Sequence, residues 1–208
     1  MRLRLVSSKD IDRPEGADAF GFLSLSPRPA GMGSYFSLRY FGRNTDSMGA
    51  FLSYHSPGPD GRCLGCMDKL AGAHKFLSDW FWKHVVPNYS NAHVAWAYRG
   101  QADQDAFYHN GTSRLQWPHS AHNKRAPIDM GRVYDLSDET DPNTKPEAMA
   151  IDLFQIVDGV AIWPTKFFYD LANDIRKLDL PIYWGGQWKS LGDKDHFQYM
   201  PDEMHLDS

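Results

Sequence analysis

Three segments far apart in the sequence carry side chains of the types that bind catalytic zinc. His122 lies in the run S-A-H-N, Asp152 ends the run A-I-D, and His196 lies in D-K-D-H-F. Two imidazoles, one carboxylate and an open fourth position form a catalytic zinc site, where the metal acidifies a water molecule and polarises a carbonyl group. A second carboxylate nearby can carry a proton from that water to a leaving amine. Asp193, three residues before His196, is the candidate for this base.

Two of the candidate ligands lie in segments whose hydrophobic pattern predicts strands. Residues 148–157 form an apolar run that is interrupted by one carboxylate, Asp152, and is followed by an Asp-Gly turn. Residues 181–184 begin another strand, which turns at two glycines, and residues 196–199 form the next one. Residues 92–98 read as a further buried strand. A ligand in an apolar strand is held rigidly, as a metal site requires.

The sequence predicts three helices, two of them from apolar residues at steps of three and four. The first begins at Met67 and stops before Pro87, the second runs from Gln101 to about His109, and the third runs from Phe167 to Leu178. Together with the strands, these helices predict an α+β fold. We expect a small antiparallel sheet that carries the zinc, with helices packed on one of its faces.

The chain divides by composition into two predicted domains. Residues 1–62 are rich in Gly, Pro and Ser, and we interpret them as a β-rich N-terminal extension of unknown role, with short strands at 34–41 and 50–54. Residues 63–208 form the predicted catalytic domain. Within it, the polar stretch 124–146 is predicted to be a long loop inserted beside the site.

The combined motifs resemble a family that contains zinc D-alanyl-D-alanine carboxypeptidases and phage L-alanyl-D-glutamate endopeptidases. That family has an Arg-bearing turn after a strand, then S-x-H, then A-x-D, and last W-G-G-x-W before an acidic residue and H-F or H-W. This chain has Tyr98-Arg99, S-A-H at 120–122, A-I-D at 150–152, and W-G-G-Q-W at 184–188 ahead of D-K-D-H-F. The resemblance covers roughly residues 67–200, and its last element is closest to the endopeptidase branch.

The resemblance implies a Hedgehog/D,D-peptidase-like fold and a role for each matching residue. Asp193 would be the general base and then the general acid. Arg99 would stabilise the oxyanion or hold a substrate carboxylate, while Ser120 and Gln104 would hydrogen-bond the substrate backbone. The implied ligands of Zn²⁺ are His122, Asp152 and His196.

The spacing of the third ligand departs from the family pattern. The family usually has S-x-H-x-x-G-x-A-x-D, and the corresponding interval, 129 − 122 = 7, leads here to Asp129. The segment around Asp129 lacks the Gly and the second Ala, and it leads into a polar loop. Asp152 lies 152 − 122 = 30 residues after His122, but in an apolar strand. We therefore favour Asp152, and Asp129 stays an alternative.

Other residues with chemical potential have simpler interpretations. Cys63 and Cys66, in C-L-G-C, are the only cysteines and are interpreted as two small thiols at a helix start, with a redox pair or an auxiliary metal site as alternatives. The acidic run 135–141 is interpreted as a soluble loop, with calcium binding as the alternative. Asp195 is expected to be solvated. The histidines without an assigned role are His74, His84, His93 and His109, with His119 at the rim of the site.

Aromatic residues make up 14% of the chain, including 7 Trp, which fits an aromatic core or groove. Within the W-G-G-Q-W run, Trp184 and Trp188 are interpreted as core residues rather than as a platform for substrate.

The composition excludes several classes of protein. The net charge of −4 and the lack of a long Lys/Arg run give no footprint for nucleic acid. No apolar run of about 18 residues predicts a membrane span, and the first residues lack the apolar core of a signal peptide.

The resemblance implies a phage endolysin that cuts the L-Ala–D-Glu bond of the peptidoglycan stem peptide. We expect a monomer that is made in a host cytoplasm and acts on the wall after release. The alternatives are a D-alanyl-D-alanine carboxypeptidase and a non-catalytic, zinc-containing wall-binding module.

Overall fold

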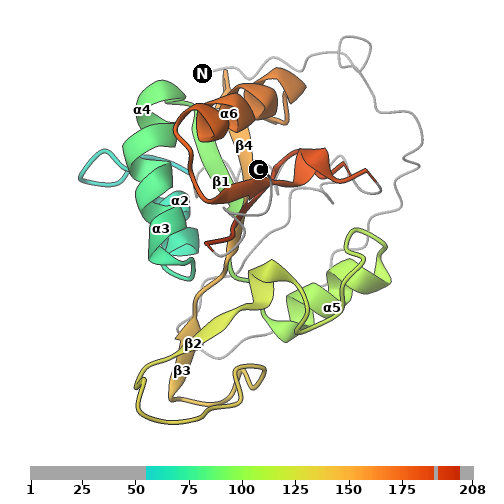
Figure 1. Ribbon diagram of the computed structural model, residues 1–208. Coiled ribbons are helices and arrows are strands. Elements are labelled where there is room, and N and C mark those ends of the chain that lie inside the picture. The colour runs from blue at the N-terminus through green and yellow to red at the C-terminus, as the bar shows by residue number, and fades with distance from the viewer. Residues whose placement is uncertain (1–54, 190–191, 202–208) are drawn as a thin grey trace. The chain divides into compact units, whose positions relative to one another are not determined.

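The computed structural model describes residues 55–189 and 192–201 (Figure 1). The strands expected at 34–41 and 50–54 lie outside the described residues, and the domain boundary at residue 62 stays a prediction. Within the described part of the chain, no helix is both long and apolar enough to cross a membrane.

An antiparallel sheet organises the described residues. Its strand order is β1-β4-β7-β6, and β5 pairs with β4 on the edge opposite β1, beyond the end of β7. The α+β class and the antiparallel sheet are confirmed; the finer assignment to the Hedgehog/D,D-peptidase-like fold stays a prediction. The strands are β1 (Ala92–Trp96), β4 (Ala150–Val157), β5 (Val160–Ile162), β6 (Ile182–Trp184) and β7 (His196–Tyr199).

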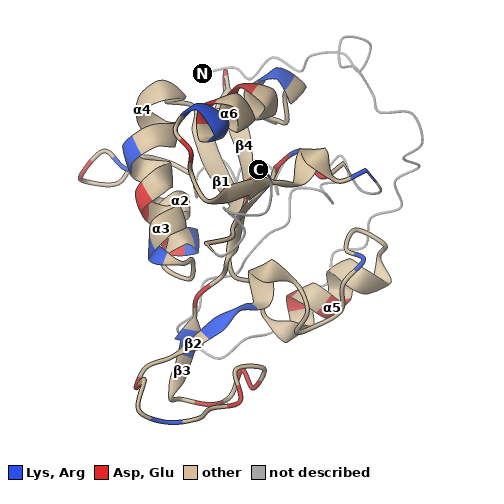
Figure 2. Ribbon diagram, in the orientation of Figure 1, with Lys and Arg blue, Asp and Glu red and all other residues tan. Residues whose placement is uncertain are grey.

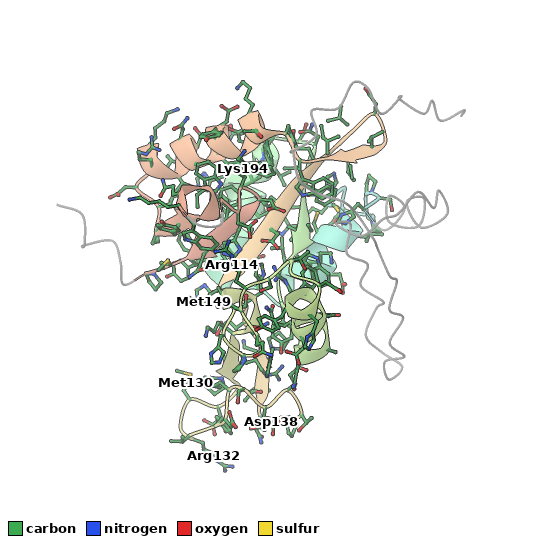
Figure 3. The ribbon with its side chains drawn as sticks, turned by 90° about the vertical axis from the view of Figure 1, so that its right-hand side faces the viewer. Arg114, Met130, Arg132, Asp138, Met149 and Lys194 are labelled. Carbon is green, nitrogen blue, oxygen red and sulfur yellow. The ribbon has the colours of Figure 1, made fainter. Side chains whose placement is uncertain are left out.

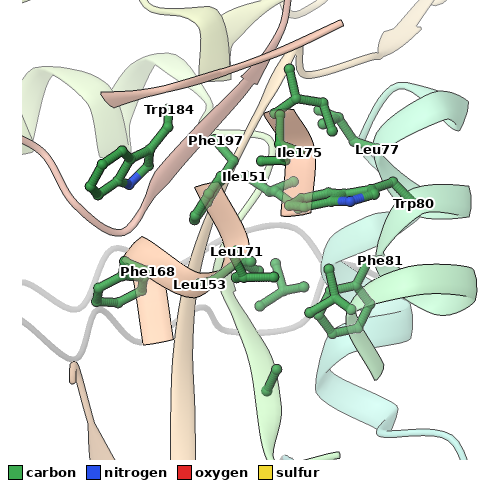
Figure 4. Packing of buried hydrophobic residues seen from close by; sticks show 14 of the residues in the cluster. Leu77, Trp80, Phe81, Ile151, Leu153, Phe168, Leu171, Ile175, Trp184 and Phe197 are labelled. Atoms are coloured by element: carbon green, nitrogen blue, oxygen red, sulfur yellow. The ribbon is translucent and has the colours of Figure 1, made fainter. Parts of the chain in front are cut away.

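The central strand β4 is apolar on both faces except at Asp152 and Gln155. Successive side chains of a strand point to opposite faces, so Ile151 and Leu153 share one face while Asp152 and Phe154 share the other. Ile151 and Leu153 are fully buried in the core with Phe197 of β7. Figure 4 shows these side chains facing those of the helices. The apolar face of the sheet therefore holds the helices, which leaves the opposite face to carry Asp152.

The long helix α6 (Thr165–Lys177) agrees with the predicted helix at 167–178 to within two residues. It begins directly after Pro164, a residue suited to a helix start because its backbone has no N–H to satisfy. Its buried stripe packs into the core, and the stripe consists of Phe167, Phe168, Leu171, Ala172 and Ile175.

The predicted single helix from Met67 to Pro87 is wrong in two respects. The structure has α2 (Leu64–Leu70), then a break, then α3 (Lys75–Trp80), which continues through the π-helix η2 (Phe81–Val85) into α4 (Val86–Asn88). The break occurs because the backbone at residues 72–74 bonds to Ala148: Ala148 N donates to Gly72 O, and His74 N donates to Ala148 O. At the other end, the widened turn of η2 lets the helix run through Pro87.

Three further elements lie around the site. Helix α5 (Gln101–His109) confirms the predicted helix in that range. The 3-10 helix η3 (Ala121–Asn123) carries His122, and a second 3-10 helix, η4 (Gly185–Gln187), forms the turn after β6.

The stretch 124–146 is more ordered than the predicted loop. Its ends pair as a two-stranded antiparallel ribbon, β2 (Arg125–Pro127) with β3 (Thr144–Pro146). The acidic residues of this stretch lie in the loop that connects the two strands (Figure 2). Figure 3 shows Met130, Arg132 and Asp138 at the far end of this loop, away from Met149. The insertion is therefore closed at its base by backbone pairing.

Candidate metal centre

The structure brings three of the predicted residues together in one buried group: His122, Asp152 and His196. His122 Nε2 lies 3.1 Å from His196 Nδ1. Asp152 Oδ1 lies 3.2 Å from each of these two nitrogens. The three atoms thus form a nearly equilateral triangle.

The sheet register places two of the three residues. Asp152 of β4 is directly opposite His196 of β7, so their side chains project from the same face. The third comes from η3, where the Ser120 hydroxyl accepts a hydrogen bond from His122 N and the Asn123 side chain accepts one from Ser120 N. This reciprocal capping fixes the short helix that presents His122.

Hydrogen bonds outside the triangle orient the imidazoles. His122 Nδ1 lies 2.7 Å from the backbone oxygen of Ala97, so it is the protonated nitrogen, and the lone pair of Nε2 faces the triangle. His196 directs Nδ1 to the triangle, while its Nε2 lies 3.4 Å from Gln198 Oε1. Each ring therefore presents a nitrogen to the shared centre.

The protonation states suit metal binding. Burial, and then the positive charge of Arg99, lowers the pKa of His122 to about 4, so its ring is neutral near pH 7. Burial alone would raise the pKa of Asp152. The contacts with the imidazoles of His122 and His196 and the positive charge of Arg99 outweigh burial and hold that pKa well below its usual range. The centre therefore combines the neutral imidazole of His122 with the carboxylate anion of Asp152.

The spacing of the triangle fits a zinc ion. With zinc–ligand bonds of about 2.0–2.1 Å at tetrahedral angles, neighbouring N and O ligand atoms lie about 3.3 Å apart. The observed separations of 3.1–3.2 Å are close to this value. Two His and one carboxylate are also the donors of one class of catalytic zinc site, which leaves a coordination position for water or substrate.

Asp129, the alternative third ligand, lies elsewhere. Its side chain is 64% exposed, and its Oδ1 accepts a hydrogen bond from Gly131 N in the loop. The metal-capable group contains Asp152 instead. The same loop contains the acidic run 135–141, and no cluster from it is among the metal-capable groups of residues 55–189 and 192–201.

Arg99 and Gln104 surround the triangle rather than project away from it. Arg99 Nη2 donates to Asp152 Oδ2 at 2.7 Å, and Nη1 lies 3.4 Å from Gln104 Oε1. The Gln104 amide nitrogen donates to Ser113 Oγ and to Leu115 O. These contacts link helix α5 to the carboxylate ligand. The predicted substrate contacts of Arg99, Gln104 and Ser120 stay predictions.

The W-G-G turn packs directly on the segment that carries Asp193. A Cβ atom added at Gly185 would lie 2.7 Å from Asp193 O and 3.1 Å from His196 Cβ, so only glycine fits there. Trp184 Nε1 also donates to Lys194 O at 2.6 Å. The turn therefore sets where the half-buried Asp193 lies relative to His196.

Two expectations near His196 need correction or refinement. Asp195 is buried rather than solvated, because its backbone oxygen accepts a hydrogen bond from Leu153 N and draws the residue into the sheet. Trp184 is a core residue, as expected. Trp188 is half-buried, and its ring centroid lies 5.0 Å from that of His196, beside the centre.

A second metal-capable group includes the two cysteines, for which an auxiliary metal site was an alternative, and two histidines that the sequence interpretation did not connect to them. It contains His55, Cys63, Cys66 and His93, which places His93, interpreted as an ordinary histidine, among side chains that could hold a metal ion. The C-x-x-C spacing was the available signal. The two histidines lie 8 residues before Cys63 and 27 residues after Cys66, and no sequence pattern linked them to the thiols.

Comparisons with known proteins give little further support. No protein-family model matches the chain, and no curated protein matches it. Among solved structures, the chain is similar to the L-Ala D-Glu endopeptidase ChiX of Serratia marcescens, with 21% identity, over 65% of this chain and 86% of that chain. The TM-score is 0.46. At that score the likeness carries no argument, and the geometry of the centre has to carry the function.

Proposed function

We propose that this chain is a zinc-dependent peptidase that hydrolyses the L-Ala–D-Glu bond of the peptidoglycan stem peptide. The observation that carries the proposal is the triangle of His122 Nε2, His196 Nδ1 and Asp152 Oδ1, with sides of 3.1–3.2 Å. It is a donor set for catalytic zinc. The choice of substrate rests on the motif resemblance, above all on the W-G-G-Q-W turn.

The residues of the chain have separate tasks in this proposal. Zinc, when bound, would polarise the scissile carbonyl and lower the pKa of a water molecule. Asp193 would accept the proton of that water on its carboxylate and deliver it to the nitrogen of the leaving amine. Arg99 holds the second oxygen of Asp152, which keeps Oδ1 directed at the imidazoles.

The setting of the reaction is also part of the proposal. We place the chain as a monomeric phage endolysin that accumulates in the host cytoplasm and reaches the wall after release. This setting rests on the family resemblance alone. It is tested by adding the full-length chain to a suspension of purified cell walls, whose turbidity should fall.

Digestion of purified peptidoglycan tests the activity and the bond. Mass spectrometry of muropeptides should show new N-terminal D-Glu peptides after incubation with the zinc-loaded chain. Loss of only the terminal D-Ala would assign the D-alanyl-D-alanine carboxypeptidase alternative. Binding to walls without any new product would assign a non-catalytic zinc module.

Asp193→Asn tests the proposed proton carrier. The variant should bind zinc normally, while its turnover falls by on the order of 10² to 10⁴-fold, the usual contribution of general acid–base catalysis. Asp158→Asn is a matched control, because Asp158 is exposed in the β4–β5 turn with φ of 51°, a conformation that Asn tolerates. Full activity of Asp193→Asn would remove Asp193 from this role.

A further inference from the structure

Four side chains outside the triangle converge in a second group. His55 and Cys63 come from the segment before α2, Cys66 lies in the first turn of α2, and His93 lies on β1. Both cysteines are free thiols rather than partners in a disulfide. We propose that these four residues bind a second zinc ion in a closed, structural site, independent of the proposed peptidase function.

The sulfur–nitrogen distances match a tetrahedral ion. Cys63 Sγ lies 3.3 Å from Nδ1 of both His55 and His93. Cys66 Sγ lies 3.8 Å from His55 Nδ1 and 3.5 Å from His93 Nδ1. Zinc bonds of about 2.3 Å to sulfur and about 2.0–2.1 Å to nitrogen put tetrahedral S and N ligands about 3.6 Å apart. All four mixed edges of the tetrahedron are therefore near their ideal length.

Backbone groups support the two sulfurs in the way that thiolate ligands need. Cys66 N donates to Cys63 Sγ at 3.2 Å, and Val94 N lies 3.4 Å from Cys66 Sγ. Such outer contacts fix the direction of metal-binding side chains. Both imidazoles also use the same nitrogen, Nδ1, toward both thiols. A disulfide-forming pair would not require this convergence of two rings.

The donor set assigns the ion and its role. Two thiolates and two neutral imidazoles balance the charge of Zn²⁺, and Cys₂His₂ is a common structural zinc set. Four protein ligands leave no position for substrate, in contrast to the three of the first centre. A hollow of about 160 Å³ beside the group is lined in part by His55, Cys63 and His93.

The second site would hold the chain before α2 against the sheet. His93 pairs with Phe154 across β1 and β4, and Phe154 is two residues from the ligand Asp152 on the same face. The His55 and His93 rings lie 5.2 Å and 5.5 Å from the Phe154 ring. Binding an ion here would therefore fix β1, α2 and residue 55 beside the strand that carries the first centre.

Metal counting on the full-length chain tests the site. After the protein is loaded with zinc and the excess zinc is removed, inductively coupled plasma mass spectrometry should find two zinc ions per wild-type chain. Cys63→Ser/Cys66→Ser should lose one ion and keep the other. His122→Ala/His196→Ala should also keep one, and this remaining ion should be the thiolate-bound one.

Cobalt loading identifies the ligands directly. The wild type and His122→Ala/His196→Ala should show thiolate-to-cobalt charge-transfer absorption, which Cys63→Ser/Cys66→Ser should lack. His109→Ala is the control, because this histidine is exposed at the end of α5 and should change neither the ion count nor the spectrum. If the cysteine variant fails to fold, His122→Ala/His196→Ala still tests the site, because it retains both thiols and should show the thiolate-to-cobalt absorption.

The possible outcomes separate the two sites. One ion per chain with thiolate absorption would support the second site and remove the first. One ion without thiolate absorption, or a Cys63–Cys66 disulfide in metal-free protein, would overturn the second site and leave the proposed peptidase function in place.

Discussion

The Arg99 guanidinium donates to Asp152 Oδ2 at 2.7 Å, which leaves Asp152 Oδ1 to face both imidazoles. One carboxylate oxygen of Asp152 thus binds the Arg99 cation, and the other is available to the proposed metal ion. Both side chains are buried, with 8% and 5% of their surfaces exposed. A buried carboxylate that loses its partner is costly, so this pair makes a strong prediction about stability.

Arg99→Met should destabilise the metal-free protein by about 3–5 kcal/mol, because it leaves a buried carboxylate without its cation. Urea denaturation in the presence of a chelator measures this change. Arg132→Met is the matched control: Arg132 and its partner Asp129 are 73% and 64% exposed, and exposed pairs contribute at most about 1 kcal/mol. Equal effects of the two substitutions would show that Arg99 does not compensate Asp152.

Asp152→Asn should weaken zinc binding at the first centre by more than about 100-fold, because losing even an outer-shell partner costs about 10–100-fold. Asp129→Asn should leave zinc affinity unchanged, since that side chain is exposed in the loop. Competition with a chromogenic chelator measures both affinities. The opposite result would move the third ligand to Asp129.

Gly185→Ala should reduce activity and destabilise the chain by about 1–3 kcal/mol, the usual cost of overpacking. The added methyl group would lie 2.7 Å from Asp193 O, so backbone has to move. In the control Gly131→Ala, the methyl group meets only the exposed side chain of Asp129 at 3.2 Å, which can swing away. Thermal denaturation and turnover measure the two variants. A fully active Gly185→Ala chain would mean that the close approach is dispensable.

The metal-free protein should lose stability as the pH falls from 6.5 towards 4. His122 has a folded pKa of about 4 against an ordinary value of 6.5, so the unfolded chain binds more protons in this window. The loss attributable to His122 should be on the order of 3 kcal/mol. Urea denaturation at several pH values checks it, with His122→Gln as the reference that lacks this titration. An unchanged pH slope in His122→Gln would assign the loss to other groups.

Local sequence signals predicted the elements that depend on local interactions. The spacing of apolar residues was sufficient for α6, and an apolar strand with one carboxylate correctly placed Asp152 in β4. The break between α2 and α3 was missed because it is made by backbone bonds to Ala148, more than 70 residues away. Helical spacing continues through that break, so periodicity could not show it.

The two metal-capable groups differ in the same way. His122, Asp152 and His196 were found because each lies in a motif whose neighbours are distinctive. His55 and His93 have no such neighbours, and only the pairing of β1 with β4 and the placement of α2 bring them to the thiols. The C-x-x-C run alone showed two ligands and left the other two unidentified.

The ribbon β2–β3 has a consequence for how this chain can vary. Met149 N donates to Ala121 O, and Glu147 N donates to Lys124 O. The residues just before β4 are therefore hydrogen-bonded to the segment that carries His122. Residues 128–143 form a loop whose length does not alter the separation of His122 and Asp152. A change in the length of this loop would therefore leave the geometry of the first centre unchanged.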